Sequence, residues 1–158
     1  MQRKYQSILF GVCMGVVMIA GFLLGSYAHA LFYQVTMFLT LLLAPLGLML
    51  YTRKQAGGYL NYGKTFQAGF IPIFLSVCIL SVFYFLYLQY LNPLAFEYEK
   101  QKTAANLKAA GMQEDLIKNT LQNMKPIKTA LNYFLSFWIV GTLSCLLYAA
   151  LCYRSETS

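Results

Sequence analysis

Few side chains in this sequence are of a type that does chemistry. His29 is the single histidine, and the five Asp and Glu residues all lie outside the long apolar segments. General acid–base and nucleophilic catalysis require a base beside a nucleophile. The sequence places no such pair within an apolar segment, so we expect a protein that is not an enzyme and has no catalytic residue.

Metal and cofactor chemistry is equally poorly supported. Cys13, Cys78, Cys145 and Cys152 lie inside apolar runs or at their ends and show no CxxC or CxxH spacing, so we interpret them as buried structural thiols. One histidine cannot supply two axial haem ligands, and a di-iron site needs several buried Glu and His. We expect no metal ion and no cofactor.

The composition indicates an integral membrane protein. Hydrophobic residues make up 59% of the 158 residues and charged residues only 11%, and the mean hydropathy is +0.55, which lies outside the range of soluble domains. The 12 Lys and Arg residues flank apolar runs and form no basic stripe with interleaved aromatics. This distribution favours topology signals and contacts with lipid headgroups, and we expect no binding of nucleic acid.

Four apolar segments are long enough to cross a bilayer as helices, at about 1.5 Å per residue and about 30 Å of hydrocarbon. They are residues 7–27, 31–51, 66–90 and 129–153. The first exceeds the ~7 to 15 residues of a signal-peptide core, so we expect a span and not a cleaved signal. The predicted fold is an all-α, four-helix membrane bundle of two transmembrane hairpins, forming a single domain over residues 1–158.

The four spans contain no Asp, Glu, Lys, Arg or His. An ionisable group at the membrane centre costs about 2.5 to 3.5 kcal/mol, so those that occur there usually serve function. Their absence argues against a proton-coupled transporter.

Small and helix-breaking residues mark the first two spans. Gly11, Gly15, Gly21 and Gly25 fall on one helical face, which permits close helix packing. The partner is either the second or fourth span of the same chain or a second copy. Pro45 is expected to kink the second span.

Polar side chains in the spans are expected mostly to form interhelical hydrogen bonds. Alternatively, some of them converge on a small polar cavity, namely Gln34, Thr36, Gln89 and Asn132.

Residues 94–128 form the one long polar stretch and predict an extramembrane helical hairpin between spans three and four. Asn92-Pro93 ends the third span, and Gly111 separates the two helices. Ile117, Leu121 and Met124 recur at helical spacing and form a narrow apolar stripe on the second helix.

Residues 51–70 form a basic connector between the two transmembrane hairpins and are the best candidate for a working surface. Arg53, Lys54 and Lys64 could hold a phosphate, and Tyr59 and Tyr62 could stack on a headgroup or hydrogen-bond to it. Alternatively, these charges only set the topology and the connector glycines only allow the chain to turn.

Arg3 and Lys4 precede the first span, which predicts a cytoplasmic N-terminus by the positive-inside rule. Four spans return the C-terminus to the same side. The connector then lies inside and the polar hairpin outside.

The chain resembles the domain of unknown function 4199 family, a group of small bacterial inner-membrane proteins with four predicted spans. The resemblance rests on the glycine-studded first span, on Tyr51-x-Arg53, on residues 58–66 followed by Gly69-Phe70, and on residues 110–112. It implies an inner-membrane location and a lipid-linked glycan pathway.

Two functions are expected from these features. The first is a non-enzymatic membrane subunit or scaffold that binds a protein partner or assembles as a homo-oligomer. The alternative is a translocator of lipids or lipid-linked sugars, or a small channel, acting as an oligomer.

Overall fold

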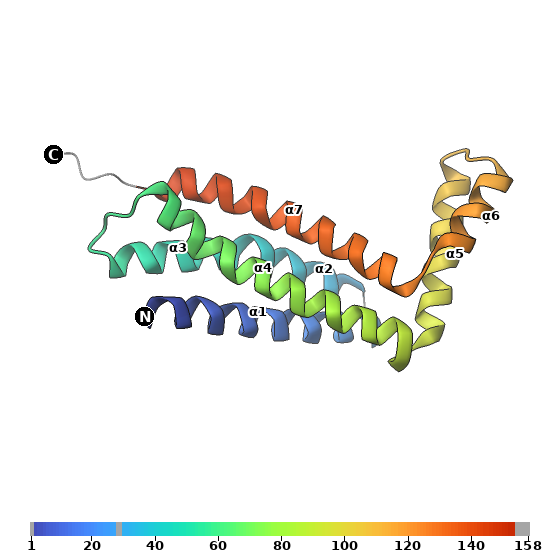
Figure 1. Cartoon of the computed structure of the whole chain (residues 1–158), viewed down its shortest axis with the longest axis horizontal. Helices are drawn as coiled ribbons and strands as arrows, with labels where there is room; N and C mark the ends of the chain where they lie inside the picture. Colours follow the sequence, from blue (N-terminus) through green and yellow to red (C-terminus); the bar gives the residue numbers. More distant parts are fainter. Residues whose placement is uncertain (1, 28–29, 154–158) are drawn as a thin grey trace. The chain divides into compact units, whose positions relative to one another are not determined.

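The protein folds almost entirely into helices (Figure 1). The computed structural model describes residues 2–27 and 30–153, and the side chains of residues 5–26 and 33–153. The elements are α1 (Gln2–Tyr27), α2 (Ala30–Phe38), the π-helical turn η1 (Leu39–Leu43), α3 (Ala44–Gln55), α4 (Tyr62–Leu86), the π-helical turn η2 (Tyr87–Leu91), α5 (Pro93–Ala109), α6 (Glu114–Asn123) and α7 (Pro126–Cys152). Outside the described part lie His29, the side chains of Arg3 and Lys4, and residues 154–158. The charges of Arg3 and Lys4, from which the cytoplasmic N-terminus is predicted, are therefore not described.

Four helical stretches are long and apolar enough to cross a membrane, which confirms the predicted all-α membrane bundle. They are Tyr5–Ser26, Tyr33–Gln55, Tyr62–Leu91 and Pro126–Cys152. The second comprises α2, η1 and α3, and the third comprises α4 and η2. The helices α5 and α6 between the third and fourth spans form the predicted helical hairpin.

The chain divides into two compact units, residues Met1–Leu80 with Phe134–Ser158, and residues Ser81–Tyr133. In the first unit, α1, α2, α3 and the adjoining parts of α4 and α7 lie side by side (Figure 1). Its buried core is rich in methionine, with Met14, Met18, Met37 and Met49 packed around Ile73, Val77 and Cys145. Flexible thioether side chains fill irregular gaps between helices of this kind.

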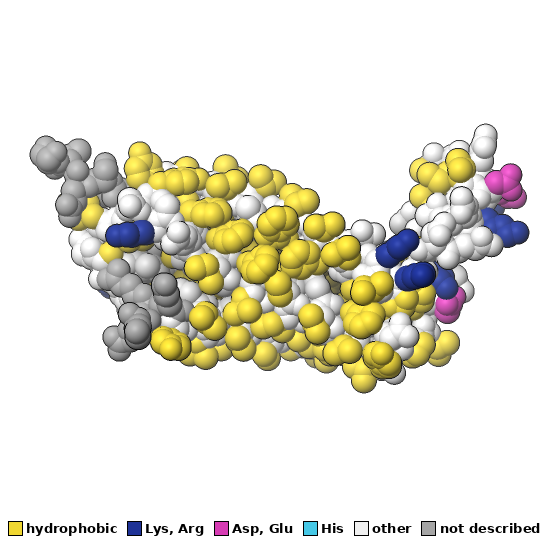
Figure 2. Space-filling model, viewed as in Figure 1, with side chains coloured by type: hydrophobic (Ala, Val, Ile, Leu, Met, Phe, Trp, Pro, Cys, Tyr) yellow, Lys and Arg dark blue, Asp and Glu magenta, His cyan; other side chains and the backbone are white. Residues whose placement is uncertain are grey.

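The outer surface of the first unit is apolar. Figure 2 shows hydrophobic side chains over the visible face of its helices, with Lys and Arg side chains at the end near the connector. Less than half of the most apolar 18-residue part of each span is buried within the chain, from 22% for the last span to 44% for the third. The remaining apolar surface is therefore available to lipid or to other membrane helices.

The glycines of α1 contact two different helices of the same chain. A Cβ at Gly11 would lie 3.0 Å from the Cα and carbonyl oxygen of Pro72, and one at Gly15 would lie 3.1 Å from Ile79, both on α4. Gly21 and Gly25 instead face Thr36 and Tyr33 of α2. The glycine face thus packs against the second and third spans, not the fourth, because α1 lies between α2 and α4.

Pro45 disturbs the second span through a π-helical turn. A proline has no N–H to donate to the preceding turn. Immediately before it, η1 widens the helix so that the Ala44 N–H bonds to the carbonyl of Leu39, five residues back. Pro72 lies inside α4 and was not singled out from the sequence. It is fully buried, and its backbone is the surface that Gly11 approaches.

Two buried serines of the bundle bond within their own helix and not between helices as expected. The Ser76 hydroxyl donates to the Ile73 carbonyl at 2.9 Å, and the Ser144 hydroxyl donates to the Val140 carbonyl at 2.9 Å. Both bonds stay within one helix, because a serine hydroxyl reaches the carbonyl three or four residues back without needing a neighbour. Gln34 and Gln89 are exposed.

Both ends of α5, the first helix of the hairpin in the second unit, are capped. The side-chain oxygen of Asn92 accepts a hydrogen bond from the Ala95 N–H at 3.3 Å and caps α5. At the other end of α5, Gly111 has φ +76°, and the Met112 N–H bonds to the Leu107 carbonyl at 3.1 Å. This is the left-handed helix ending predicted at Gly111. On α6, Ile117 is buried.

Candidate functional site

The connector begins with a tight helix ending after α3. The Gly57 N–H bonds to the carbonyl of Lys54 at 3.2 Å, and the Gly58 N–H bonds to the carbonyl of Arg53 at 3.0 Å. Gly57 and Gly58 have φ values of +78° and +94°. This pair of bonds is a Schellman motif, which needs glycine where φ is positive. The turn is therefore a defined structure.

Arg53 fastens this turn to the last helix. Its Nε donates to the carbonyl of Gly58 at 3.2 Å, and its Nη1 donates to the carbonyl of Cys152 at 3.3 Å. Cys152 ends α7, where carbonyls lack helical partners and carry the negative end of the helix dipole. Arg53 is half-buried, and its guanidinium joins the turn after α3 to the end of α7.

The start of α4 fixes the other side of the connector. The Asn61 side-chain oxygen accepts the N–H of Lys64 at 2.9 Å, and the hydroxyl of Thr65 donates to the Asn61 carbonyl at 3.0 Å. Thr65 and Leu60 are buried. An Asn that caps the first turn of a helix in this way satisfies a donor that would otherwise lack a partner.

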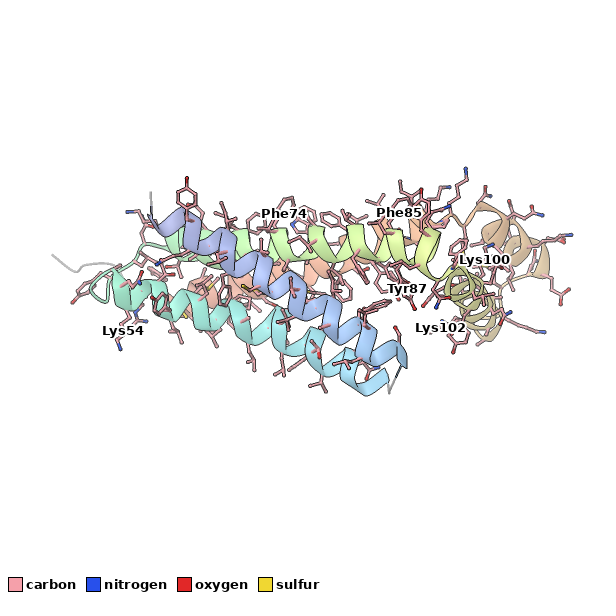
Figure 3. All side chains as sticks on the ribbon, turned by 90° about the horizontal axis from the view of Figure 1, so that it is seen from below. Lys54, Phe74, Phe85, Tyr87, Lys100 and Lys102 are labelled. Atoms are coloured by element: carbon pink, nitrogen blue, oxygen red, sulfur yellow. The ribbon has the colours of Figure 1, made fainter. Side chains whose placement is uncertain are left out.

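The other four predicted site residues present their side chains at the surface. Lys54 and Lys64 are exposed, and Lys54 projects away from the helices in Figure 3. Tyr59 is 50% exposed and Tyr62 is 40% exposed. Tyr62 also contacts the end of α7, with its hydroxyl 3.5 Å from the Leu146 carbonyl and its ring edge-on to that of Tyr153.

The chemistry available at the connector is anion binding. Residues 51–70 contain Arg53, Lys54 and Lys64 and no Asp or Glu. Among the described residues, neither lysine forms an ion pair, and an ammonium group offers three hydrogen-bond donors. Tyr59 and Tyr62 of the same segment add exposed phenol groups, and phenol and ammonium groups can both donate hydrogen bonds to a phosphate or a carboxylate.

A second candidate site lies in the hairpin unit and was not identified from the sequence. Its walls come from α5, α6 and the first two turns of α7, and its volume is about 570 Å³. Its polar lining includes Glu99, Thr103, Asn119, Asn123, Lys128 and Asn132. Of the four residues expected to share a cavity, Asn132 lines this one. Polar pairs spaced four residues apart on three separate helices are the sequence signal that points to it.

The expected absence of a metal site bears on how the His, Cys, Asp and Glu side chains of the described residues are grouped. No group of three or more His, Cys, Asp or Glu side chains is close enough there to hold a metal ion. The four cysteines are unpaired, and Cys145 and Cys152 are buried while Cys13 is exposed. The expectation of four buried thiols is therefore wrong for Cys13, which lies on an outward face of α1.

Comparison with known families, curated proteins and solved structures gives one match. No curated protein matches the chain. No solved structure matches it either. The family described as "Protein of unknown function (DUF4199)" matches residues 9–154, which is nearly the whole chain and includes the last three spans, the connector, the hairpin and all but the first four residues of the first span. The chain therefore belongs to the DUF4199 family of proteins of unknown function.

Proposed function

We propose that this protein is a non-enzymatic subunit of a bacterial inner membrane that binds a protein partner through its connector. Lys54, Tyr59, Tyr62 and Lys64 form the connector surface, and both termini lie in the cytoplasm. The observation that carries the proposal is that exposed cations and phenols stand on a backbone fixed at both ends by the Schellman turn and the Asn61 cap. Binding to such a surface costs little ordering entropy.

The partner that fits this surface is an acidic cytoplasmic segment of another membrane protein. Tyrosine is enriched among residues that dominate binding energy, because it combines a large apolar ring with a polar tip. Cations that lack an acidic neighbour are complementary to carboxylates and steer their approach. A role in a lipid-linked glycan pathway, which the family resemblance implies, belongs to this proposal.

Co-purification from native membranes tests this function. The full-length chain is cross-linked in membranes and extracted in mild detergent, as the wild type and as the double variant Lys54→Gln/Lys64→Gln. The matched control is Lys102→Gln/Lys118→Gln, which removes the same charge from the hairpin. We expect a protein partner with the wild type and the control, and a severalfold lower yield with the connector variant. A chain that runs as a monomer and captures no partner refutes the proposal.

A reporter fused after Ser158 tests the orientation separately. The proposed topology requires that the reporter be active in the cytoplasm. Activity only outside the cell would place the connector on the wrong side for a cytoplasmic partner.

The second candidate function is the translocation of lipids or lipid-linked sugars by an oligomer. The same pair of lysines favours it, because Lys54 and Lys64 can also bind the phosphate of an anionic headgroup. Reconstituted into vesicles, a translocator would speed the exchange of a fluorescent anionic lipid between leaflets, and the connector variant would abolish this. Exchange no faster than in protein-free vesicles excludes the candidate.

A further inference from the structure

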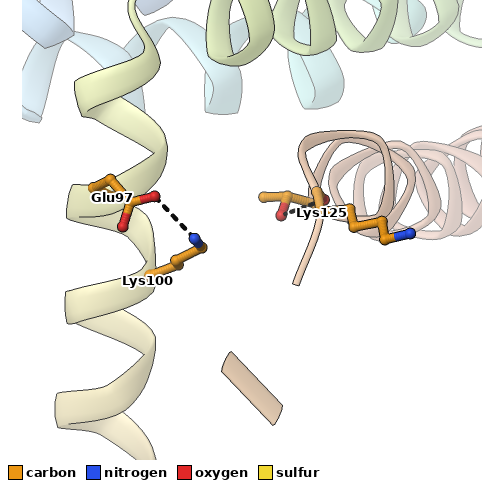
Figure 4. A network of polar contacts seen from close by, with 4 residues as sticks. Glu97, Lys100 and Lys125 are labelled. Carbon is orange, nitrogen blue, oxygen red and sulfur yellow. Dashed lines mark hydrogen bonds and ion pairs between the residues drawn. The ribbon is translucent and has the colours of Figure 1, made fainter. Parts of the chain in front are cut away.

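The hairpin cavity brings together charges of opposite sign that do not pair with each other. Among the described residues, the ion pair of this unit joins Lys100 to Glu97 at 2.8 Å on one face of α5 (Figure 4). Glu99 and Lys128 both line the cavity, and neither forms an ion pair with a described residue. One wall of the cavity therefore offers a carboxylate and another wall an ammonium group to a common occupant.

The α5 wall is rich in hydrogen-bond acceptors. Glu99 and Thr103 lie one turn apart on α5 and both face the cavity. The hydroxyl of Thr103 donates its proton to the carbonyl of Glu99 at 2.8 Å, so towards a ligand its oxygen can act only as an acceptor. On α6, the Thr120 hydroxyl is likewise committed to the Leu116 carbonyl at 2.8 Å. A primary ammonium group, with three donors, suits such a set.

The α7 wall supplies the opposite character. Lys128 and Asn132 lie one turn apart in the first two turns of α7 and line the cavity. An ammonium and a carboxamide are donors for a phosphate oxygen. Asn119 and Asn123 of α6 add further amide groups, tied to each other by an Nδ2–Oδ1 bond of 3.0 Å.

The α7 segment that carries these donors is also where the fourth span begins. Next to Lys128 and Asn132 in the sequence stand Ile127 and Leu131, which are 60% and 54% exposed. They form a neighbouring apolar stripe on the same two turns of the helix. A ligand held at Lys128 can thus continue into an acyl chain along this stripe.

We propose that the hairpin cavity binds a zwitterion made of a primary ammonium and a phosphate, as in a phosphatidylethanolamine headgroup. The ammonium bonds to Glu99 and Thr103, and the phosphate bonds to Lys128 and Asn132. The site is separate from the connector surface, so it stands or falls independently of the partner proposed above.

Lipid retention by the full-length protein in detergent tests this site. Native mass spectrometry compares phosphatidylethanolamine with phosphatidylcholine, which has no ammonium N–H, and phosphatidylglycerol, which has no ammonium. We expect phosphatidylethanolamine to be retained roughly tenfold more than either of the other two lipids, because each of them lacks one group that forms a charge-assisted hydrogen bond. Equal retention of all three lipids would overturn the proposal.

Two matched pairs of variants locate the site. Glu99→Gln is compared with Glu97→Gln, which removes the same charge two residues away and outside the cavity. Lys128→Gln is compared with Lys125→Gln, whose ammonium points away from α5 (Figure 4). We expect only Glu99→Gln and Lys128→Gln to lower ethanolamine lipid retention by about tenfold. If a cavity variant matches its control while its circular dichroism shows an intact fold, the assignment is wrong.

Soluble phosphoethanolamine distinguishes a lipid from a free zwitterion as the source. We expect it to displace the lipid only at concentrations far above that of the lipid, because it lacks the acyl chain that contacts Ile127 and Leu131. Displacement at equal concentration would refute the lipid as the occupant. Displacement of the lipid by phosphate alone, at the same concentration as by phosphoethanolamine, would refute the role of Glu99.

Discussion

Replacing Gly11 with alanine gives a direct measure of how α1 packs on α4. The added Cβ would lie 3.0 Å from the Cα and the carbonyl oxygen of Pro72, and 3.1 Å from the Cβ of Leu75. Carbon atoms in ordinary contact are about 3.5 to 4.0 Å apart, so the two helices must separate by several tenths of an ångström. Pro72 cannot turn aside, because its ring fixes φ and it lies within a helix.

The expected cost follows from two opposing terms. Overpacking of a close contact costs about 1 to 3 kcal/mol, and the change from glycine to alanine in a helix returns about 0.5 to 1 kcal/mol. The control is Gly47→Ala on α3, where a Cβ would meet no atom within 4 Å. That variant has only the favourable term. We expect Gly11→Ala to be less stable than Gly47→Ala by about 1 to 3 kcal/mol.

Titration with sodium dodecyl sulfate in mild detergent measures this difference. The chain has a single tryptophan, and Trp138 packs partly buried against the core of the first unit. Its fluorescence therefore follows unfolding of that unit without a label. If Gly11→Ala unfolds at the same or a higher detergent fraction than Gly47→Ala, α1 does not approach Pro72 as closely as the structure shows.

Three further substitutions test the connector by the same titration and the hairpin by thermal melting. Arg53→Gln removes two hydrogen bonds of a half-buried cation and should lower the free energy of unfolding by about 1 to 2 kcal/mol. Lys54→Gln, the control, should leave the midpoint unchanged. Equal effects of the two substitutions would show that Arg53 has no structural role. Asn92→Ala removes the α5 cap and should lower the free energy of unfolding by about 1 kcal/mol. Asn106→Ala, on an exposed face of α5, should lower it by nothing, and the reverse order would contradict the assignment of Asn92 as the cap. Gly111→Ala forces a side chain into φ +76° and should destabilise the hairpin by about 1 kcal/mol, which an unchanged melting curve would disprove.

Local signals in the sequence predict the parts of the fold that depend on neighbouring residues. The four spans follow from apolar length. The start of α5 follows from Asn92-Pro93, and its end follows from Gly111, because a cap and a left-handed turn are decided within a few residues. The hairpin between the third and fourth spans follows from the same signals.

Contacts between distant segments could not be predicted in this way. The spacing of the glycines puts Gly11 and Gly25 on one face of α1. Which helix each glycine contacts, α4 for Gly11 and α2 for Gly25, depends on how the three helices pack. From its type and position, Arg53 is a candidate for binding an anion. Only the fold shows that its guanidinium instead donates a hydrogen bond to the carbonyl of Cys152. The hairpin cavity likewise requires α5, α6 and α7 to meet.

The bond from Arg53 to Cys152 has a consequence for biogenesis. Its two partners are 99 residues apart in the chain, so the turn at Gly57 and Gly58 cannot acquire this support until α7 has been synthesised and has packed beside it. A chain truncated before α7 would carry every connector residue but lack this support. The shape of the turn at Gly57 and Gly58 therefore depends on α7, and a ligand that recognises this shape would bind only chains in which α7 is in place.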